Sequence, residues 1–292
     1  MNIQINAYAK INLHLDVTQI RDDGYHNIQS IMQSISLCDI VDIEITDDKS
    51  IIIECDVTGV PLDEKNIAYK AARRFFDKAG IEKGAIIKIQ KNIPMAAGLA
   101  GGSADGAAVL VGLNKLFNGI LSKDELYSIG ASLGADVPFC MNCGCCVTEG
   151  IGDKLTEISS LPSNTVLVIA CGGEGVSTPM AYKLLDEKHK RFVNYIPKSY
   201  NKLVDSLYNE KSDFHRYFFN IFEGPISNER PVVTEVRALM LDNGAKVAMM
   251  SGSGPSVFGV FDNIETARDS VELIKSQGYF ADVAFPTAKR IL

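Results

Sequence analysis

The chain has 292 residues, with 29 Lys and Arg against 36 Asp and Glu, which gives a formal net charge of −7. No block of Lys and Arg stands out, which argues against a nucleic-acid-binding protein, and no apolar run reaches the roughly 18 residues of a membrane span. The N-terminus lacks the basic start and continuous apolar block of a signal peptide. We therefore expect a cytoplasmic protein of about two domains that binds neither nucleic acid nor membrane.

The first half of the chain is rich in strands. Residues 4–17 alternate polar and apolar side chains, which predicts a strand with one apolar face. The other face carries Tyr8, Lys10, Asn12 and His14, and it is either a solvated polar face or part of a site. Lys10 and Asn12 point to the same side, because they lie two apart on a strand. Further strands are expected at residues 28–35, 40–45, 51–55, 85–90 and 140–146, and helices at 66–79, 103–117 and 123–133.

The second half follows an expected linker at residues 159–164. Strands are predicted at 165–170, 245–250, 256–261 and 280–285, with several helices before residue 243 and another at 265–277. Leaving the extra helices aside, the order is β-α-β-β-α-β, which is typical of a ferredoxin-like unit. The sequence thus predicts an α/β (α+β) chain with domains at 1–160 and 161–292.

Four of the seven cysteines lie within seven residues: Cys140, Cys143, Cys145 and Cys146. Their spacing is not that of a common zinc site, and no second pair of ligands completes it. We expect small hydrophobic side chains filling a buried strand, with no metal site. Whether the cluster has a redox or metal role stays open.

Residues 94–106, PMAAGLAGGSADG, form a nearly bare stretch that leads into a predicted helix. No Lys follows the glycines as in a Walker A loop, and their spacing does not fit a dinucleotide-binding fingerprint. A bare loop before a helix N-terminus near Gly102 and Ser103 is suited to an anion, because backbone N–H groups and the helix dipole face it. The alternative is a flexible connector with Ser103 as helix cap.

The segment PMAAGLAGGSADGAA resembles the phosphate loop of the GHMP kinases, which bind ATP without a Walker A motif. The segments AYAKINLHLDVTQIRDDGYHNIQSIM, GADVPF, STPMAY and SGSGPSVFGVF resemble further blocks of that family, in the family's order. Ala100 stands where a glycine is usual, so we expect no positive φ there. Ala104 replaces a second serine, which leaves Ser103 as the hydroxyl of the loop.

The resemblance implies a two-lobed fold, with an N-terminal GHMP kinase domain over 1–160 and a ferredoxin-like C-terminal GHMP kinase domain over 161–292. It implies ATP as co-substrate, with Mg²⁺, and phosphorylation of the 2-hydroxyl of 4-diphosphocytidyl-2-C-methyl-D-erythritol in the cleft between the lobes. By the same resemblance the catalytic residues are Lys10 and, as the base beside it, Asp136. A monomer or a homodimer is expected.

The resemblance also assigns binding residues. Tyr25 and His26 follow a turn and would bind cytosine, with Tyr182 closing the other face of the base. The full substrate set is Asn12, Tyr25, His26, Thr178 and Tyr182, and the ATP set is Asn66 with Pro94, Met95, Ala96, Ala97, Gly98, Leu99, Ala100, Gly101, Gly102, Ser103 and Ala104.

The residues alone leave other interpretations open. Asp136 could cap a turn, Asn66 could cap a helix, and Tyr25 with His26 could be an exposed loop pair. A GHMP kinase for another small alcohol, such as mevalonate or homoserine, is one alternative function. A nucleotide-binding or metal-binding module without catalysis is another.

Overall fold

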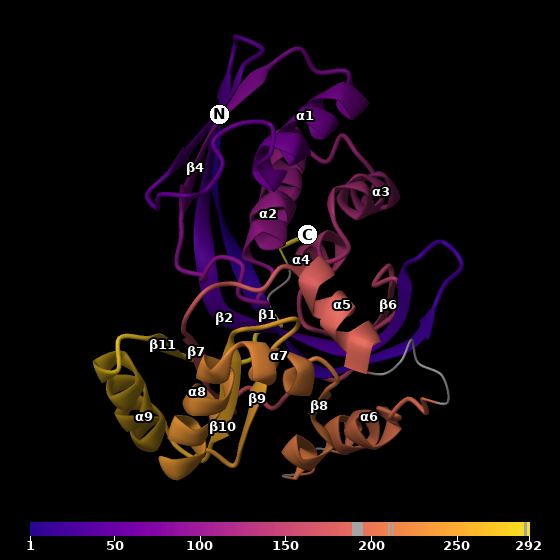
Figure 1. Cartoon of the computed structure of the whole chain (residues 1–292). Helices are drawn as coiled ribbons and strands as arrows, with labels where there is room; N and C mark the ends of the chain where they lie inside the picture. The colour runs from indigo at the N-terminus through magenta and orange to yellow at the C-terminus, as the bar shows by residue number, and fades with distance from the viewer. Residues whose placement is uncertain (189–194, 210, 212, 289–290) are drawn as a thin grey trace.

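The computed structural model describes residues 1–188, 195–209, 211, 213–288 and 291–292, and it contains two sheets (Figure 1). The strands are β1 (Asn2–Ile20), β2 (His26–Thr46), β3 (Ile51–Cys55), β4 (Gly84–Gln90), β5 (Cys145–Gly150), β6 (Lys154–Glu157), β7 (Val166–Cys171), β8 (Phe219–Asn220), β9 (Val247–Met250), β10 (Val257–Phe261) and β11 (Phe280–Ala284). The helices are α1 (Ile67–Ala79), α2 (Gly101–Leu116), α3 (Lys123–Leu133), α4 (Val137–Asn142), α5 (Thr178–Lys188), α6 (Asn201–Tyr208), α7 (Glu223–Glu229), α8 (Pro231–Asp242) and α9 (Ile264–Ser276), with a short 3-10 helix at Phe214–Tyr217.

The larger sheet has the strand order β3-β4-β2-β1-β8, with β5 and β6 joined to β2. The strands expected at residues 28–35 and 40–45 are one continuous strand, β2. Its middle is held by segments far away in the sequence. Ser34 N donates to Gly144 O at 2.8 Å, and Ser36 N donates to Phe285 O at 2.8 Å. The prediction of two separate strands is therefore wrong, because long-range contacts that no local pattern contains continue the strand.

Register shifts in the β1–β2 pair flank the middle of β1. They lie between Tyr8 and Lys10 and between Asn12 and His14. Such irregularities bend a strand and re-aim its side chains. The segment with Lys10 and Asn12 is therefore oriented by the irregularities on either side of it.

Both faces of β1 are covered. Ile5 and Ala7 pack with the helices of the first lobe, our name for the part around the larger sheet. Ile11 and Leu13 belong to a core shared with the second lobe, the part around the smaller sheet. Lys10 is only 4% exposed and Asn12 1%. The strand prediction is confirmed, and the alternative of a solvated polar face is wrong.

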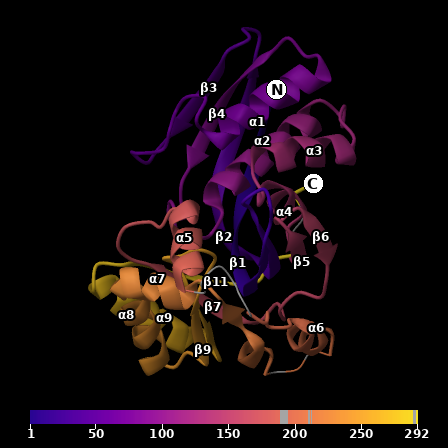
Figure 2. The ribbon, with the colours of Figure 1, turned by 45° about the vertical axis from the view of Figure 1, so that its right-hand side comes forward.

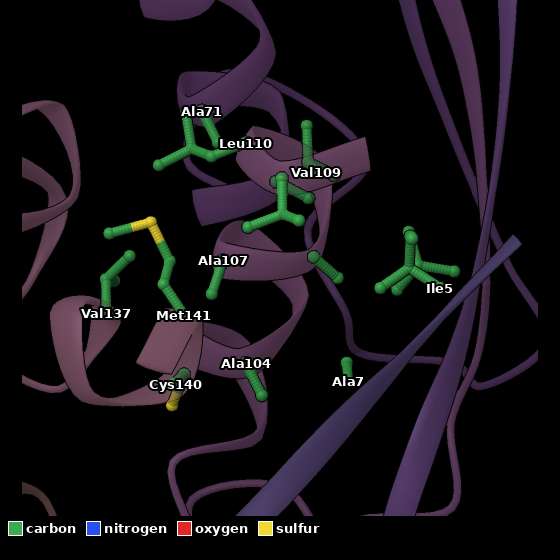
Figure 3. Close-up of a cluster of buried hydrophobic side chains, with 14 of the residues drawn as sticks. Ile5, Ala7, Ala71, Ala104, Ala107, Val109, Leu110, Val137, Cys140 and Met141 are labelled. Carbon is green, nitrogen blue, oxygen red and sulfur yellow. The ribbon is translucent and has the colours of Figure 1, made fainter. Parts of the chain in front are cut away.

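Helix α2 lies in the centre of the first lobe, between β1 and α4 (Figure 3). Its small side chains let the neighbours approach closely, and Ala104 and Ala107 are both fully buried. A Cβ placed on Gly106 would lie 2.5 Å from Ile67 Cγ2 on α1. Some of the small residues in 94–106 are therefore needed for helix packing and not for binding an anion. The sequence alone did not predict this second reason.

The smaller sheet is antiparallel, with the order β11-β7-β10-β9, and α8 and α9 are its two connecting helices. This is the ferredoxin-like β-α-β-β-α-β unit predicted from the sequence. Helix α5 lies beside α7, close to the junction with the first lobe, in both views (Figures 1 and 2).

Two segments from the second half of the chain join the first lobe. Strand β8 pairs with β1 in parallel, and Pro286 forms a bridge with Ile35 of β2. The C-terminus then lies next to α2 and α4, where Ile291 is buried and its carbonyl accepts from Lys115 Nζ at 2.6 Å (Figure 1). The domain boundary at 160 and 161 stays a prediction. Within the described residues, no helix combines the length and the apolar composition needed to cross a bilayer.

Candidate functional site

A cleft of about 1230 Å³ runs between the lobes. This exceeds the volume of a usual site for one small ligand, roughly 300–1,000 Å³, so it has room for two. Its lining includes Pro61, Asn66 and the glycine loop, and also Tyr25, Tyr182 and Phe222. Lys10 and Asp136 line the same cleft: Lys10 contacts the loop at Gly98 O, and the charge of Asp136 acts on Tyr182.

The glycine loop ends one or two residues earlier than expected, because α2 begins at Gly101. Its N-cap is Ala100, which has φ +61°, so the expectation of an ordinary φ at this alanine is wrong. The first intrahelical bond runs from Ala104 N to Ala100 O at 2.9 Å. Ser103 is the third helical residue and not the cap. The N–H groups of the first turn have no intrahelical acceptor, and Gly101, Gly102 and Ser103 line the cleft.

Ala100 gives a prediction about stability. Ala100→Val should lower the free energy of unfolding by about 2 kcal/mol or more, because a β-branched residue fits the left-handed region poorly. Ala100→Gly should change it by less than about 1 kcal/mol, because glycine adopts this φ without strain. Urea unfolding of both variants measures the difference. A mild effect of valine with a larger loss for glycine would contradict the positive φ.

A second glycine-rich segment, residues 251–256 of the second lobe, packs against the loop from behind. Ser256 N donates to Ala97 O at 3.1 Å, and Ser251 Oγ donates to Gly98 O at 3.2 Å. A Cβ on Gly98 would lie 2.3 Å from Ser251 O, and Gly98 has φ +79°. Glycine at this position is therefore required by both conformation and space, and the second lobe fixes the shape of the loop.

Lys10 is also tied to the loop. Its ammonium donates to Gly98 O at 2.9 Å and to Asn12 Oδ1 at 2.6 Å. Asn12 Nδ2 in turn donates to Ser30 Oγ at 2.8 Å, and that hydroxyl donates to His14 O at 2.7 Å. The amide of Asn12 is thus fixed in orientation, and it holds the ammonium at the edge of the cleft.

Asp136 occupies the N-cap position of α4, and its side chain makes no capping hydrogen bond. The capping alternative is therefore wrong for the carboxylate, which lines the cleft. Lys10 and Asp136 form no ion pair in the part of the chain that the structure describes, so a direct pairing is not seen. Both charges act on buried Cys140: burial raises the pKa of that thiol well above its ordinary value, the charge of Asp136 raises it further and that of Lys10 lowers it.

An aromatic cluster lines part of the cleft. The rings of His26 and Tyr182 are 4.4 Å apart at an interplanar angle of 31°, and Phe222 meets Tyr182 edge-on at 5.0 Å. His26 Nε2 is 2.8 Å from Asp186 Oδ1. Burial raises the pKa of Tyr182 to about 12, and the charges of Asp136 and Asp186 act in the same direction. Tyr25, 64% exposed, stands at the rim with Thr178.

Two members of this cluster were missed from the sequence. Asp186 lies four residues after Tyr182 on α5, so the helical spacing of i and i+4 could have placed both on one face. Phe222 comes from a turn between β8 and α7, and no local signal in the sequence connects it with Tyr182.

The remaining predicted residues divide into two groups. Asn66 caps α1, because its side chain accepts from Ala68 N at 2.9 Å, and it also lines the cleft. Leu99 and Ala104 do not line the cleft, since their side chains are buried in the cores. The roles of all these residues in binding and catalysis stay predictions.

The cysteine-rich stretch, residues 140–146, begins in helix α4 and ends in strand β5. Cys140 belongs to α4, Cys143 ends that helix with φ +56°, and only Cys145 and Cys146 lie in β5. The predicted strand over 140–146 is wrong at its start, while the expectation of burial is confirmed. Burial raises the pKa of the Cys143 thiol to about 11. In the described ranges, no three His, Cys, Asp or Glu side chains gather in a way that could hold a metal ion.

Comparison with known proteins adds the family. Residues 66–144 match the GHMP kinases N terminal domain, and residues 201–275 match the GHMP kinases C terminal domain. A 4-diphosphocytidyl-2-C-methyl-D-erythritol kinase of Clostridium perfringens is 41% identical over 284 residues, 96% of either chain. One of Clostridioides difficile is 44% identical over 268 residues, which is 91% of this chain and 88% of the relative.

The chain belongs to the 4-diphosphocytidyl-2-C-methyl-D-erythritol kinase family of the GHMP kinases. A crystal structure of 4-(cytidine 5'-diphospho)-2C-methyl-D-erythritol kinase superposes on the kinase with a TM-score of 0.82. It covers 98% of this chain and 100% of its own, at 29% identity. The two-lobed GHMP kinase fold expected from the resemblance is therefore confirmed.

Proposed function

We propose that this chain is an ATP-dependent kinase that phosphorylates the 2-hydroxyl of 4-diphosphocytidyl-2-C-methyl-D-erythritol, giving the 2-phosphate and ADP in non-mevalonate isoprenoid precursor synthesis. The observation that carries the proposal is the arrangement of the cleft. One cleft is lined by a bare loop with a helix N-terminus, by an aromatic cluster, by Lys10, which contacts the loop, and by Asp136, whose charge acts on Tyr182.

The glycine loop is suited to the triphosphate. N–H groups of the first turn of α2 face the cleft with no helical acceptor, and the dipole of the helix favours an anion there. Hydrogen bonds aimed at the phosphate oxygens stabilise the charge of the transferring phosphoryl group. Asn66 and Pro61 line the adjoining wall, where the adenine would lie.

Asp136 is proposed as the base. Its carboxylate would accept the proton of the 2-hydroxyl as the oxygen attacks the γ phosphorus, and the bond from that phosphorus to the β-γ bridging oxygen breaks as ADP leaves. Such transfers have loose transition states, so orienting the hydroxyl matters more than a strong base. Lys10 would offset charge on the transferring group, and Asn12 holds its ammonium in place.

Mg²⁺ is proposed to enter with ATP. The described residues offer no cluster of three acidic, His or Cys side chains to cage it. Mg²⁺ commonly keeps several waters and is held largely by substrate phosphates. The ion would neutralise charge on the phosphates.

The reaction is tested by ADP release from ATP and Mg²⁺ with three alcohols: the diphosphocytidyl substrate, mevalonate and homoserine. ADP should appear with the first alone. Release with mevalonate or homoserine alone would keep the kinase and reject the cytidine pocket. No release with any alcohol, despite nucleotide binding, would favour a module without catalysis.

The aromatic cluster predicts a selective loss of substrate affinity. Tyr182→Ala should raise KM for the cytidine substrate about 5- to 150-fold, because stacking on a base contributes about 1–3 kcal/mol. Tyr182→Phe keeps the ring and should stay near wild type. KM for ATP, measured in the same assays, should change little. Equal rises in both KM values would indicate a general disturbance of the cleft instead of a base platform.

A further inference from the structure

Three charged side chains lie buried beneath the glycine loop, outside every role assigned above. The ammonium of Lys91 forms ion pairs with Asp39 and with Asp105. The side chains are 6%, 0% and 5% exposed in the order Lys91, Asp39 and Asp105. Asp39 comes from β2, Lys91 follows β4 and Asp105 belongs to α2. We call this group the buried charge triad.

The triad connects both ends of the glycine loop. At its start, Asp39 Oδ1 accepts from Asn92 N at 2.6 Å and from Ile93 N at 2.8 Å. At its end, a Cβ on Gly101 would lie 3.2 Å from Lys91 Nζ, so the ammonium lies directly under the first residue of α2. One ammonium thus links the strand side of the loop to the helix N-terminus.

The charges of the triad do not balance. Two carboxylates share one ammonium, so the group carries a charge of −1 when both are ionised. Asp105 Oδ1 is buried with no hydrogen-bond partner in the described structure, and Asp105 and Lys91 both line the cleft together with the glycine loop. The groups that act on Asp105 are Lys91 and Asp39, and its own charge acts on Cys140 of α4. An anion bound at the loop therefore meets a negative charge unless a proton removes it.

We propose that the buried charge triad is a positioning device for the nucleotide: it fixes both ends of the glycine loop, and it takes up a proton when the triphosphate binds. The proposal rests on the proposed function in one respect, namely that the loop binds ATP. Its members act through the loop, so they are positioning residues and not catalytic ones.

The titration of Asp105 fits this role. Burial raises the pKa of Asp105 to about 7, the charge of Lys91 opposes the rise and that of Asp39 adds to it. A triphosphate nearby favours the protonated form, so it raises this pKa further. Nucleotide binding then takes up a proton just above pH 7, and the affinity for nucleotide falls as the pH rises through that window.

The experiment is calorimetric binding of a non-hydrolysable ATP analogue with Mg²⁺ at pH 7.5, in two buffers of different ionisation enthalpy. The difference in heat gives the number of protons taken up. The wild type should take up a fraction of one proton, and Asp105→Asn should abolish that uptake. In steady-state assays from pH 6.5 to 8.5, KM for ATP should rise several-fold with pH in the wild type and lose most of this dependence in the variant.

Two further variants make the test selective. Glu54→Gln breaks the exposed pair with Lys88 on the sheet and should keep wild-type proton uptake. Asp39→Asn weakens the anchor of Asn92 and Ile93, so it should raise KM for ATP about 3- to 10-fold, by a larger factor than it lowers kcat. Equal proton uptake in the wild type and Asp105→Asn would overturn the proposal.

The proposal can also be tested on the wild-type protein alone, so the test does not depend on whether a variant folds. Nucleotide binding without proton uptake, and with a KM for ATP that does not change with pH, would reject the triad's role while leaving the kinase intact. Failure of the wild type to bind the nucleotide would reject the proposed function itself, so the two failures are distinguishable.

Discussion

Asp136→Asn should lower kcat by about 10²- to 10⁴-fold, the usual contribution of a positioned acid or base. Asparagine has nearly the same shape but accepts no proton from the hydroxyl. It is also as good a helix cap as aspartate, so the start of α4 at Val137 should be undisturbed. KM for ATP should change less than kcat, because the carboxylate is proposed to act on the hydroxyl of the other substrate and not to bind the phosphates.

The measurement is steady-state turnover with the cytidine substrate, together with thermal unfolding. Asp124→Asn, an exposed aspartate in the first turn of α3, is a matched control and should retain full turnover. Near-normal turnover of Asp136→Asn would reject this residue as the base.

Lys10→Met should lower kcat by about 10²- to 10³-fold and should also raise KM for ATP. The first effect follows from the loss of a cation near the transferring phosphoryl group, a typical magnitude for one stabilising group. The second follows because Gly98 O loses the donor that holds it at 2.9 Å. Gly98 O keeps only the weaker contact from Ser251 Oγ at 3.2 Å. Asn12 Oδ1 loses the donor at 2.6 Å, and an unpaired buried acceptor costs about 1–3 kcal/mol.

A double variant separates mechanism from folding. If Lys10 and Asp136 act on the same step, Lys10→Met with Asp136→Asn should have a kcat close to that of the worse single variant. Losses that multiply would indicate independent roles. Lys88→Met, on the exposed face of the sheet, controls for the loss of a positive charge. A Lys10→Met variant with wild-type kcat would show that the ammonium is only structural.

Some features of the chain were determined by the sequence alone. Helix α1 starts after Asn66, whose side chain bonds to an N–H two residues later, and the predicted range 66–79 matches it. Helix α3 has the predicted bounds, with a capping box between Ser122 and Glu125. The order of strands and helices in the second lobe was also predicted correctly from the sequence. These features depend on hydrogen bonds and periodicity within a few residues, which a local sequence pattern contains.

Other features were decided only by the tertiary structure. From the residues alone, the polar side of β1 could be a solvated face or part of a site; in the structure Lys10 and Asn12 are buried, and both contact the glycine segments. Ala100 adopts a positive φ in a loop whose Ala97 and Gly98 carbonyls are held by Lys10 and residues 251–256, and such contacts outweigh the preference of an alanine. Local propensity is a weak prior that such contacts override.

The site shows the same division. Motifs predicted the glycine loop, Lys10 and Asp136 as site residues, since each lies in a short recognisable segment. The pairing of His26 with Asp186 and the triad of Asp39, Lys91 and Asp105 join positions that lie 14 to 160 residues apart. No periodicity connects such residues, because only the packing of β2, α2 and α5 around one cleft brings their charges together. The sequence alone thus determined the local elements and the chemistry available, and the tertiary structure decided which of these groups meet.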